Sequence, residues 1–278
     1  MRSFAYTQQS QAWATKFLTS QSDSLVIAAR PANSYGTRFI VGEVNIQNRS
    51  GGSVVAGIGG RLPVSLWQAG LWDDSGYAAG TAYIDDTTDW QDAGAGDFLL
   101  GTDSVNDDGI LISCLVPFNI VSIVVGTASS GGAPAWSLEY SIASAGTGTA
   151  NNWATISNPY VAPLFTATGE QLVWFEPPAD WVPVTAATAI MDLHGATVPS
   201  GYAIRIKQTA AGTVSAGLGT IAVLGRMVMS GESLGDNSVF TNLGGLELPL
   251  PPQCDAICAA ISVANSQNRV EVKYRYAG

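Results

Sequence analysis

The sequence predicts an all-β protein: a jelly-roll-like β-sandwich with an additional small β element formed by the terminal segments. Short runs of alternating apolar and polar residues recur along the chain, and Gly, Pro and Asn turns separate them. No segment keeps a helical period for more than about three turns. The composition combines 31 Gly and 46% hydrophobic residues with only 12% charged residues. This composition is typical of a rigid, turn-rich β protein, or of one that shares its surface with neighbours in an assembly.

Changes in composition along the chain predict four parts. Asp73–Tyr83 is rich in Gly, Ala and Asp and indicates a boundary, and Leu248–Pro252 reads as a rigid, extended connector. The expected parts are an N-terminal arm at 1–36, a β-hairpin region at 37–76, a central β-sandwich at 77–230, and a connector with a C-terminal β-hairpin that packs with the N-terminal region at 231–278.

The first two parts contain one ambiguous segment and one clear turn. Residues 8–18 fit either a short helix or an extended arm. Asn48–Gly52 is a turn signal between β-type runs at 38–48 and 53–66, which predicts a hairpin. The glycines at 57, 59 and 60 predict a bulge or close backbone packing in the second strand.

The remaining strands follow from apolar runs and alternation. In the C-terminal segment, Val270, Val272, Tyr274 and Tyr276 face one way, and the charged residues between them face the other. This C-terminal hairpin can pair with the hairpin at 38–66, in which case the two termini build one small domain around the inserted sandwich. The other expected strands are two within 110–125, broken near Pro117, and those at 136–142, 172–175, 202–207, 220–229 and 255–263.

The charge distribution excludes two classes of partner. The formal net charge is −10, and no cluster of Lys and Arg exists; Arg269, Lys273 and Arg275 form the densest basic stretch, which Glu271 dilutes. Binding to nucleic acid or to an anionic membrane needs such a cluster. The first ten residues lack the apolar core of a signal peptide, and 110–126 is too polar to span a membrane. We therefore expect a soluble chain made in a cytoplasm.

Metal ligands and catalytic groups are sparse. Cys254 and Cys258 form one Cys-x3-Cys pair without the further ligands that zinc needs, so buried reduced thiols are expected. Asp103, Asp107 and Asp108 loosely resemble a Ca²⁺ loop but lack its strict spacing. His194 lies near Asp192 without a nucleophile elbow, and Glu170, Glu176 and Asp180 fit turns beside Trp174 and Trp181 better than a glycosidase pair. No cofactor and no enzymatic activity are expected.

Aromatic residues offer two alternatives. The eight Trp and nine Tyr could form a sugar-binding platform, although packing in a sandwich core explains most of them. The apolar residues of the terminal segments and of the 37–76 region are also candidates for contacts between subunits. These interface candidates are Trp13, Phe17, Leu18, Trp67, Trp72, Val270, Val272, Tyr274 and Tyr276.

Several motifs resemble those of a group of tailed-bacteriophage virion structural proteins. The most distinctive is Pro177–Pro183, which reads Pro-Pro-Ala-Asp-Trp-Val-Pro, followed by Gly-Tyr-Ala-Ile-Arg at Gly201–Arg205. The resemblance covers about residues 40–230 and implies a β-sandwich in the particle, without catalytic residues. The other motifs that carry it are 55–62, 67–72, 83–89 with 92–94 and Asp97, 117–119, 136–140, and 168–170 with Phe175 and Glu176.

These observations together predict a non-enzymatic structural protein of a phage virion, assembled in the host cytoplasm. The first hypothesis is a head decoration (cement) protein whose partners are the major capsid protein and copies of itself, with a trimer expected. It would stabilise the shell because surface buried between subunits favours the assembled state. The alternative is a tail or baseplate protein that binds glycans on the host surface through exposed aromatic residues.

Overall fold

The structure is a computed structural model, and most of the residues that it describes lie in β-strands. It describes residues 12–17, 28–30, 38–52, 54–72, 83–85, 87, 109–125, 136–143, 150–157, 160–161, 169–184, 200–208, 218–224, 233–234, 239–242, 248–261 and 267–277. These residues form several antiparallel sheets and contain no α-helix, only a short 3-10 turn at Val64–Leu66. The predicted all-β sandwich class is confirmed.

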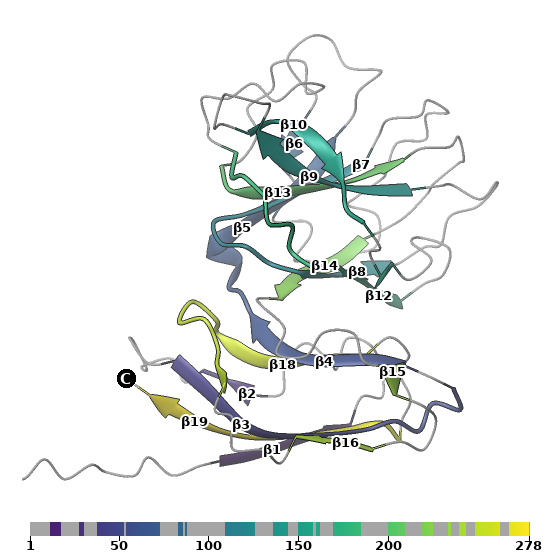
Figure 1. Ribbon diagram of the computed structural model, residues 1–278, viewed down its shortest axis with the longest axis vertical. Coiled ribbons are helices and arrows are strands. Elements are labelled where there is room, and N and C mark those ends of the chain that lie inside the picture. The colour runs from purple at the N-terminus through teal and green to yellow at the C-terminus, as the bar shows by residue number, and fades with distance from the viewer. Residues whose placement is uncertain are drawn as a thin grey trace, which may run out of the picture. The chain divides into compact units, whose positions relative to one another are not determined.

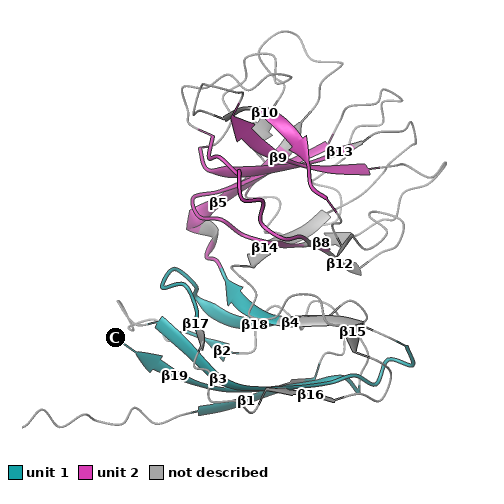
Figure 2. Ribbon diagram, viewed as in Figure 1, with its two compact units in different colours: residues 1–61, 225–278 teal, residues 62–224 magenta. Residues whose placement is uncertain are grey.

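The chain divides into two compact units (Figure 2). Unit 1 contains residues 1–61 and 225–278, and unit 2 contains residues 62–224. Both ends of the chain therefore build unit 1, and unit 2 is inserted between them. The division falls after Arg61, so the strand at Trp67–Trp72, which the sequence grouped with the 37–76 region, belongs to unit 2.

Unit 1 contains two layers of strands (Figure 1). One has the order β1-β19-β3-β16, with β17 also paired to β3, and the other has the order β4-β18-β2, with β15 also paired to β4. The bounds are β1 Ala12–Phe17, β2 Ala28–Ala29, β3 Arg38–Gln47, β4 Val54–Arg61, β15 Ser233–Leu234, β16 Val239–Asn242, β17 Leu248–Pro249, β18 Ala256–Ile261 and β19 Arg269–Ala277.

The two hairpins expected in unit 1, one at 38–66 and one in the C-terminal segment, do not form. The expected pairing between these two regions does occur. β3 and β4 lie in different layers, and so do β18 and β19. β3 pairs with β19, and β4 pairs with β18. The Asn48–Gly52 turn therefore carries the chain from one layer to the other. Its buried Asn48 accepts a hydrogen bond from the Ser50 amide at 2.9 Å and donates one to the Gly52 carbonyl at 2.7 Å.

The core of unit 1 lies on one face of the β19–β3 ladder. Val270 is paired with Ile46 and Val272 with Val44, and all four side chains are buried. The register shifts by one residue at Gly42, since Lys273 lies opposite Glu43 and Tyr274 lies opposite Val41. This bulge keeps the apolar residues on either side of it on the same face.

Close packing of a glycine is confirmed in the second layer. A Cβ atom at Gly60 would lie 2.3 Å from the Sγ atom of Cys254, so only glycine fits beside this buried thiol.

Unit 2 also contains two layers of antiparallel strands. One has the order β10-β9-β13-β7-β5-β6, and the other contains β11-β12-β8-β14. As predicted, the apolar segment before residue 126 forms two strands with Pro117 between them. The bounds are β5 Trp67–Trp72, β6 Tyr83–Asp85, β7 Gly109–Cys114, β8 Ile120–Val125, β9 Trp136–Ala143, β10 Ala150–Thr155, β11 Tyr160–Val161, β12 Gly169–Trp174, β13 Tyr202–Gln208 and β14 Leu218–Leu224.

An aromatic cluster helps to form the core of unit 2. Phe118, Phe175 and Trp181 meet edge to face, with ring centroids 5.1–5.9 Å apart. This geometry adds about 0.5–1.5 kcal/mol per pair beyond the burial of area. Trp181 also lies 5.4 Å from the ring of Tyr202, so the cluster holds the start of β13.

Candidate functional site

The candidate site is the solvent-facing side of the β1-β19-β3 layer of unit 1. In the ladder, Trp13 lies opposite Lys273, Thr15 opposite Glu271 and Phe17 opposite Arg269. Directly opposite residues of an antiparallel pair point to the same face. We call this face, opposite the buried Val270 and Val272, the outer face; its residues are Trp13, Thr15, Phe17, Glu43, Asn45, Gln47, Arg269, Glu271 and Lys273.

Two aromatic side chains on β1 are the clearest departure from an ordinary polar face. Trp13 is 53% exposed and Phe17 is 52% exposed. The Nζ atom of Lys273 lies 5.3 Å from the centroid of the Trp13 ring, and the guanidinium carbon of Arg269 lies 5.9 Å from that of Phe17. These cation–π contacts restrain both rings while about half of each side chain remains open to solvent.

A polar hollow lies next to this aromatic row. Asn45, Gln47, Arg269 and Glu271 line a volume of about 210 Å³. Glu271 accepts hydrogen bonds from Arg269 and, at 3.0 Å, from the Nδ2 atom of Asn45. The buried Oδ1 atom of Asn45 and Nε atom of Arg269 have no partner among the described residues. Both atoms belong to residues that line the hollow.

β1 is also the edge strand of its layer among the described strands. It pairs with β19 on one side, and no described strand pairs with its other side. The segment was predicted as either a short helix or an extended arm, and the structure makes it an extended edge strand. An edge strand presents backbone N–H and C=O groups to which another chain can add a strand.

The other predicted interface residues lie in different environments. Trp67, Val270 and Val272 are buried, so these three side chains pack within their own units and are not available at a surface. Tyr274 and Tyr276 pack on Phe39, with ring centroids 6.0 and 5.1 Å away. Leu18 and the side chain of Trp72 lie outside the described part of the structure.

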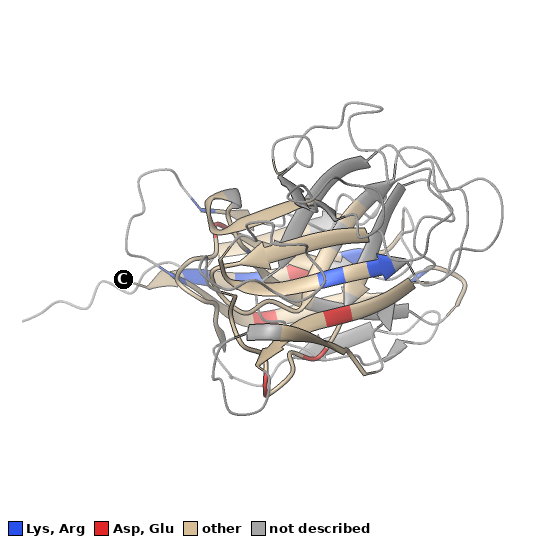
Figure 3. Cartoon of the chain, turned by 90° about the horizontal axis from the view of Figure 1, so that it is seen from above, with Lys and Arg blue, Asp and Glu red and all other residues tan. Residues whose placement is uncertain are grey.

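Basic and acidic residues both occur on the described strands (Figure 3). On β19, Arg269, Glu271 and Lys273 follow one another on the outer face. The outer face therefore does not provide the continuous basic surface that binding to a phosphate backbone requires.

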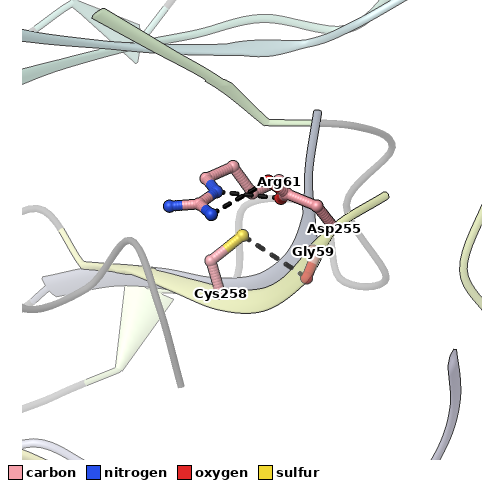
Figure 4. A network of polar contacts seen from close by, with 4 residues as sticks. All are labelled: Gly59, Arg61, Asp255 and Cys258. Carbon is pink, nitrogen blue, oxygen red and sulfur yellow. Dashed lines mark hydrogen bonds and ion pairs between the residues drawn. The ribbon is translucent and has the colours of Figure 1, made fainter. Parts of the chain in front are cut away.

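The cysteines are buried free thiols, as predicted. Cys258 donates a weak hydrogen bond to the Gly59 carbonyl, with 3.6 Å between the two atoms (Figure 4). Beside it, Arg61 contacts both carboxylate oxygens of Asp255 at 2.9 Å. The hydrogen bond to Asp255 raises the pKa of the Arg61 guanidinium. This ion pair connects the end of β4 to the residue before β18.

The predicted metal and catalytic candidates give no assembled site in the described residues. Asp103, Asp107, Asp108, Asp192 and His194 lie outside them, as does the side chain of Glu170. No group of three or more potential metal ligands occurs among the residues that are described. Asp180 accepts a hydrogen bond from the Tyr140 hydroxyl at 2.9 Å, and Glu176 is exposed.

The segments Pro177–Pro183 and Gly201–Arg205, on which the sequence resemblance mainly depends, lie together in the structure. Val184 and Gly201 exchange backbone hydrogen bonds of 2.7 and 2.9 Å. The Nε1 atom of Trp181 donates to the Ala203 carbonyl at 3.1 Å, and its side chain is buried. Trp181 is therefore a packing anchor, as expected if core packing explains most of the aromatic residues.

Sequence reasoning missed the hollow. The alternation along β19 placed Arg269 and Glu271 on a polar face, but no local signal placed Asn45 and Gln47 of β3 beside them. Only the strand order brings these residues together.

Comparisons with other proteins add no assignment. No protein-family model, no curated protein and no solved structure matches this chain. Within the described residues, no helix has the length and apolar character needed to cross a membrane.

Proposed function

We propose that this chain is a non-enzymatic structural protein of a tailed-phage virion, and specifically a head decoration protein. The observation that carries the proposal is the position of β1: a strand from the N-terminal segment forms an edge of unit 1 with no described strand beyond it. Such an edge can accept a strand from a neighbouring protein, which is a recurring way for one chain to bind another.

A partner protein could attach to β1 without disturbing the core of unit 1. Val270 and Val272 lie in the core on β19, the next strand inward, and are fully buried. β1 places only Ala12, Ala14 and Lys16 opposite the core-facing residues of β19. β1 therefore adds backbone hydrogen bonds to unit 1, while the large core residues of this unit lie on other strands.

The mechanism is mass action between subunits. Contacts made only in the assembled shell favour that state by an amount that grows with the concentration and affinity of the added subunit. The major capsid protein would be the main partner, and copies of this chain would complete a closed, trimeric arrangement. The low fraction of charged residues, 12%, suits extensive contacts between subunits.

The phage-like motifs support the same class of protein. Their most distinctive segments, at Pro177–Pro183 and Gly201–Arg205, fold as one packed element through Trp181 and Ala203. A structural role explains this arrangement because Trp181 is enclosed by packing and hydrogen bonds. No further reactive group is needed to account for its position.

Immunogold labelling of intact particles with an antibody to this chain tests the proposal. We expect label distributed over the head. Label confined to the tail tip would overturn the decoration role in favour of a tail or baseplate protein, and the absence of label from particles would overturn the virion assignment itself.

A further inference from the structure

We propose that the outer face of unit 1 is a binding site for a neutral saccharide. The polar part of the site is the hollow lined by Asn45, Gln47, Arg269 and Glu271. This inference goes beyond the structural role proposed above and does not depend on it, since it concerns the face of the sheet and not the open edge of β1.

The hydrogen-bonding groups of the hollow match a hydroxyl group. The Oδ1 atom of Asn45 is an acceptor without a partner among the described residues, and the Nε atom of Arg269 is a donor in the same situation. Buried polar atoms normally have partners, because leaving one unpaired costs about 1–3 kcal/mol. A hydroxyl both donates and accepts, so one sugar hydroxyl, or two adjacent ones, can satisfy both atoms.

The aromatic row supplies the apolar half of a sugar site. Trp13 and Phe17 are two positions on either side of Thr15 on β1, so both rings point to the outer face. Stacking on the C–H face of a sugar needs an exposed ring held in a fixed orientation. Both rings are about half exposed, and the contacts with Lys273 and Arg269 favour one orientation of each ring.

The size of the hollow indicates one sugar ring of a longer ligand. Its volume of about 210 Å³ is several times the ~30 Å³ that one water molecule occupies in the liquid. It is smaller than the roughly 300–1,000 Å³ of pockets that enclose whole small molecules. A chain of sugars could therefore place one residue in the hollow and continue over Phe17 and Trp13.

The charges favour a neutral ligand. Arg269 and Glu271 both line the hollow and contact each other, so their charges balance locally. The chain as a whole carries a net charge of −10, which repels acidic polysaccharides and phosphates at long range. An anionic group in the hollow would also meet the carboxylate of Glu271.

The test uses the purified full-length chain on an array of neutral and acidic glycans. Binding to a neutral glycan is then measured by titration, with tryptophan fluorescence as the readout. Trp13→Ala removes one ring and Asn45→Ala removes the unpartnered acceptor. Leu115→Ala is the matched control, since Leu115 is an apolar side chain of unit 2 that is 57% exposed. Calorimetry replaces fluorescence for Trp13→Ala, and circular dichroism checks that each variant is folded.

We expect a neutral glycan to bind, Trp13→Ala and Asn45→Ala each to weaken binding about tenfold, and Leu115→Ala to have no effect. The absence of binding to every neutral glycan would overturn the proposal, and so would binding to acidic glycans alone. Neutral-glycan binding that neither outer-face variant weakens would place the site elsewhere and overturn it as well. The binding assay contains only the purified chain and glycans, so none of these outcomes depends on the proposed role in the virion.

Discussion

Arg269 on β19 lies over the ring of Phe17 on β1, with 5.9 Å between the guanidinium carbon and the ring centroid. The two residues are directly opposite in the β1–β19 ladder, at the end nearest the start of β19. The same guanidinium contacts Glu271, which lines the hollow with it. One side chain therefore connects the aromatic row of the outer face with its polar hollow.

The first prediction concerns the energetic difference between the two faces of this layer. Phe17→Ala should lower the free energy of unfolding by only about 1 kcal/mol, because the ring is half exposed and its cation–π contact is weak in water. Val272→Ala, at a fully buried position, should lower it by about 2 kcal/mol. Urea denaturation measures both. Equal losses would contradict the assignment of Phe17 to the outer face.

The second prediction tests the contact between Gly60 and Cys254. Gly60→Ala should destabilise the protein by about 1–3 kcal/mol, since the new Cβ would lie 2.3 Å from Sγ and 2.8 Å from Cβ of Cys254. In a Gly60→Ala/Cys254→Ala double variant, part of this loss should be recovered because the closer atom is gone. A double-mutant cycle measures the coupling. Strictly additive losses would show that the two residues do not meet.

The third prediction concerns alkaline pH. Burial raises the pKa of the Cys114 thiol from 9.0 to about 11. Between pH 9 and 11 the unfolded chain releases this proton before the folded chain does, so stability falls as pH rises through this window. The loss attributable to Cys114 should reach about 2–3 kcal/mol.

Urea denaturation at several pH values measures this loss, with Cys114→Ala as the control. Burial also raises the pKa of Tyr140 and Tyr276, so the variant should keep a weaker pH dependence of the same sign. An identical alkaline loss in the variant and the natural sequence would rule out a contribution from Cys114.

The fourth prediction concerns a buried ion pair in unit 2. Arg205 contacts Glu139, and the exposed fractions of their side chains are only 5% and 16%. The guanidinium carbon also lies 4.8 Å from the centroid of the Trp153 ring. Arg205→Met should cost about 3–5 kcal/mol because it leaves the Glu139 carboxylate without its cationic partner. Arg205→Met/Glu139→Gln should cost clearly less, and a double variant as unstable as the single one would contradict the pairing.

The local alternation predicted which residues share a face of β19, but not that this face is the core, since Val270 and Val272 were candidates for contacts between subunits. The alternation of Val270 and Val272 with charged residues predicted the two faces of β19, and both valines are buried. The break at Pro117 was predicted for a similar reason, because proline cannot donate to a ladder and so separates β7 from β8.

The sheet to which each strand belongs could not be predicted. The Asn48–Gly52 signal specifies a chain reversal, and a reversal within one sheet has the same local chemistry as a crossing between two layers. The crossing depends on residues far away in sequence: the Arg49 amide donates to the side chain of Asn268 at 2.7 Å. The hollow was missed for the same reason, since it forms only when β3 lies beside β19.

The most direct measurement is co-sedimentation of the purified chain with virions that lack it. Three forms are compared: the full chain, a variant without residues 2–17, and Trp13→Ala/Phe17→Ala, which keeps the edge strand but removes both rings. We predict that the full chain and the double substitution bind, and that the truncated chain, shown to be folded by circular dichroism, does not. Binding of the truncated chain as tight as that of the full chain would contradict attachment through β1. Failure of the full chain to bind would contradict the virion role.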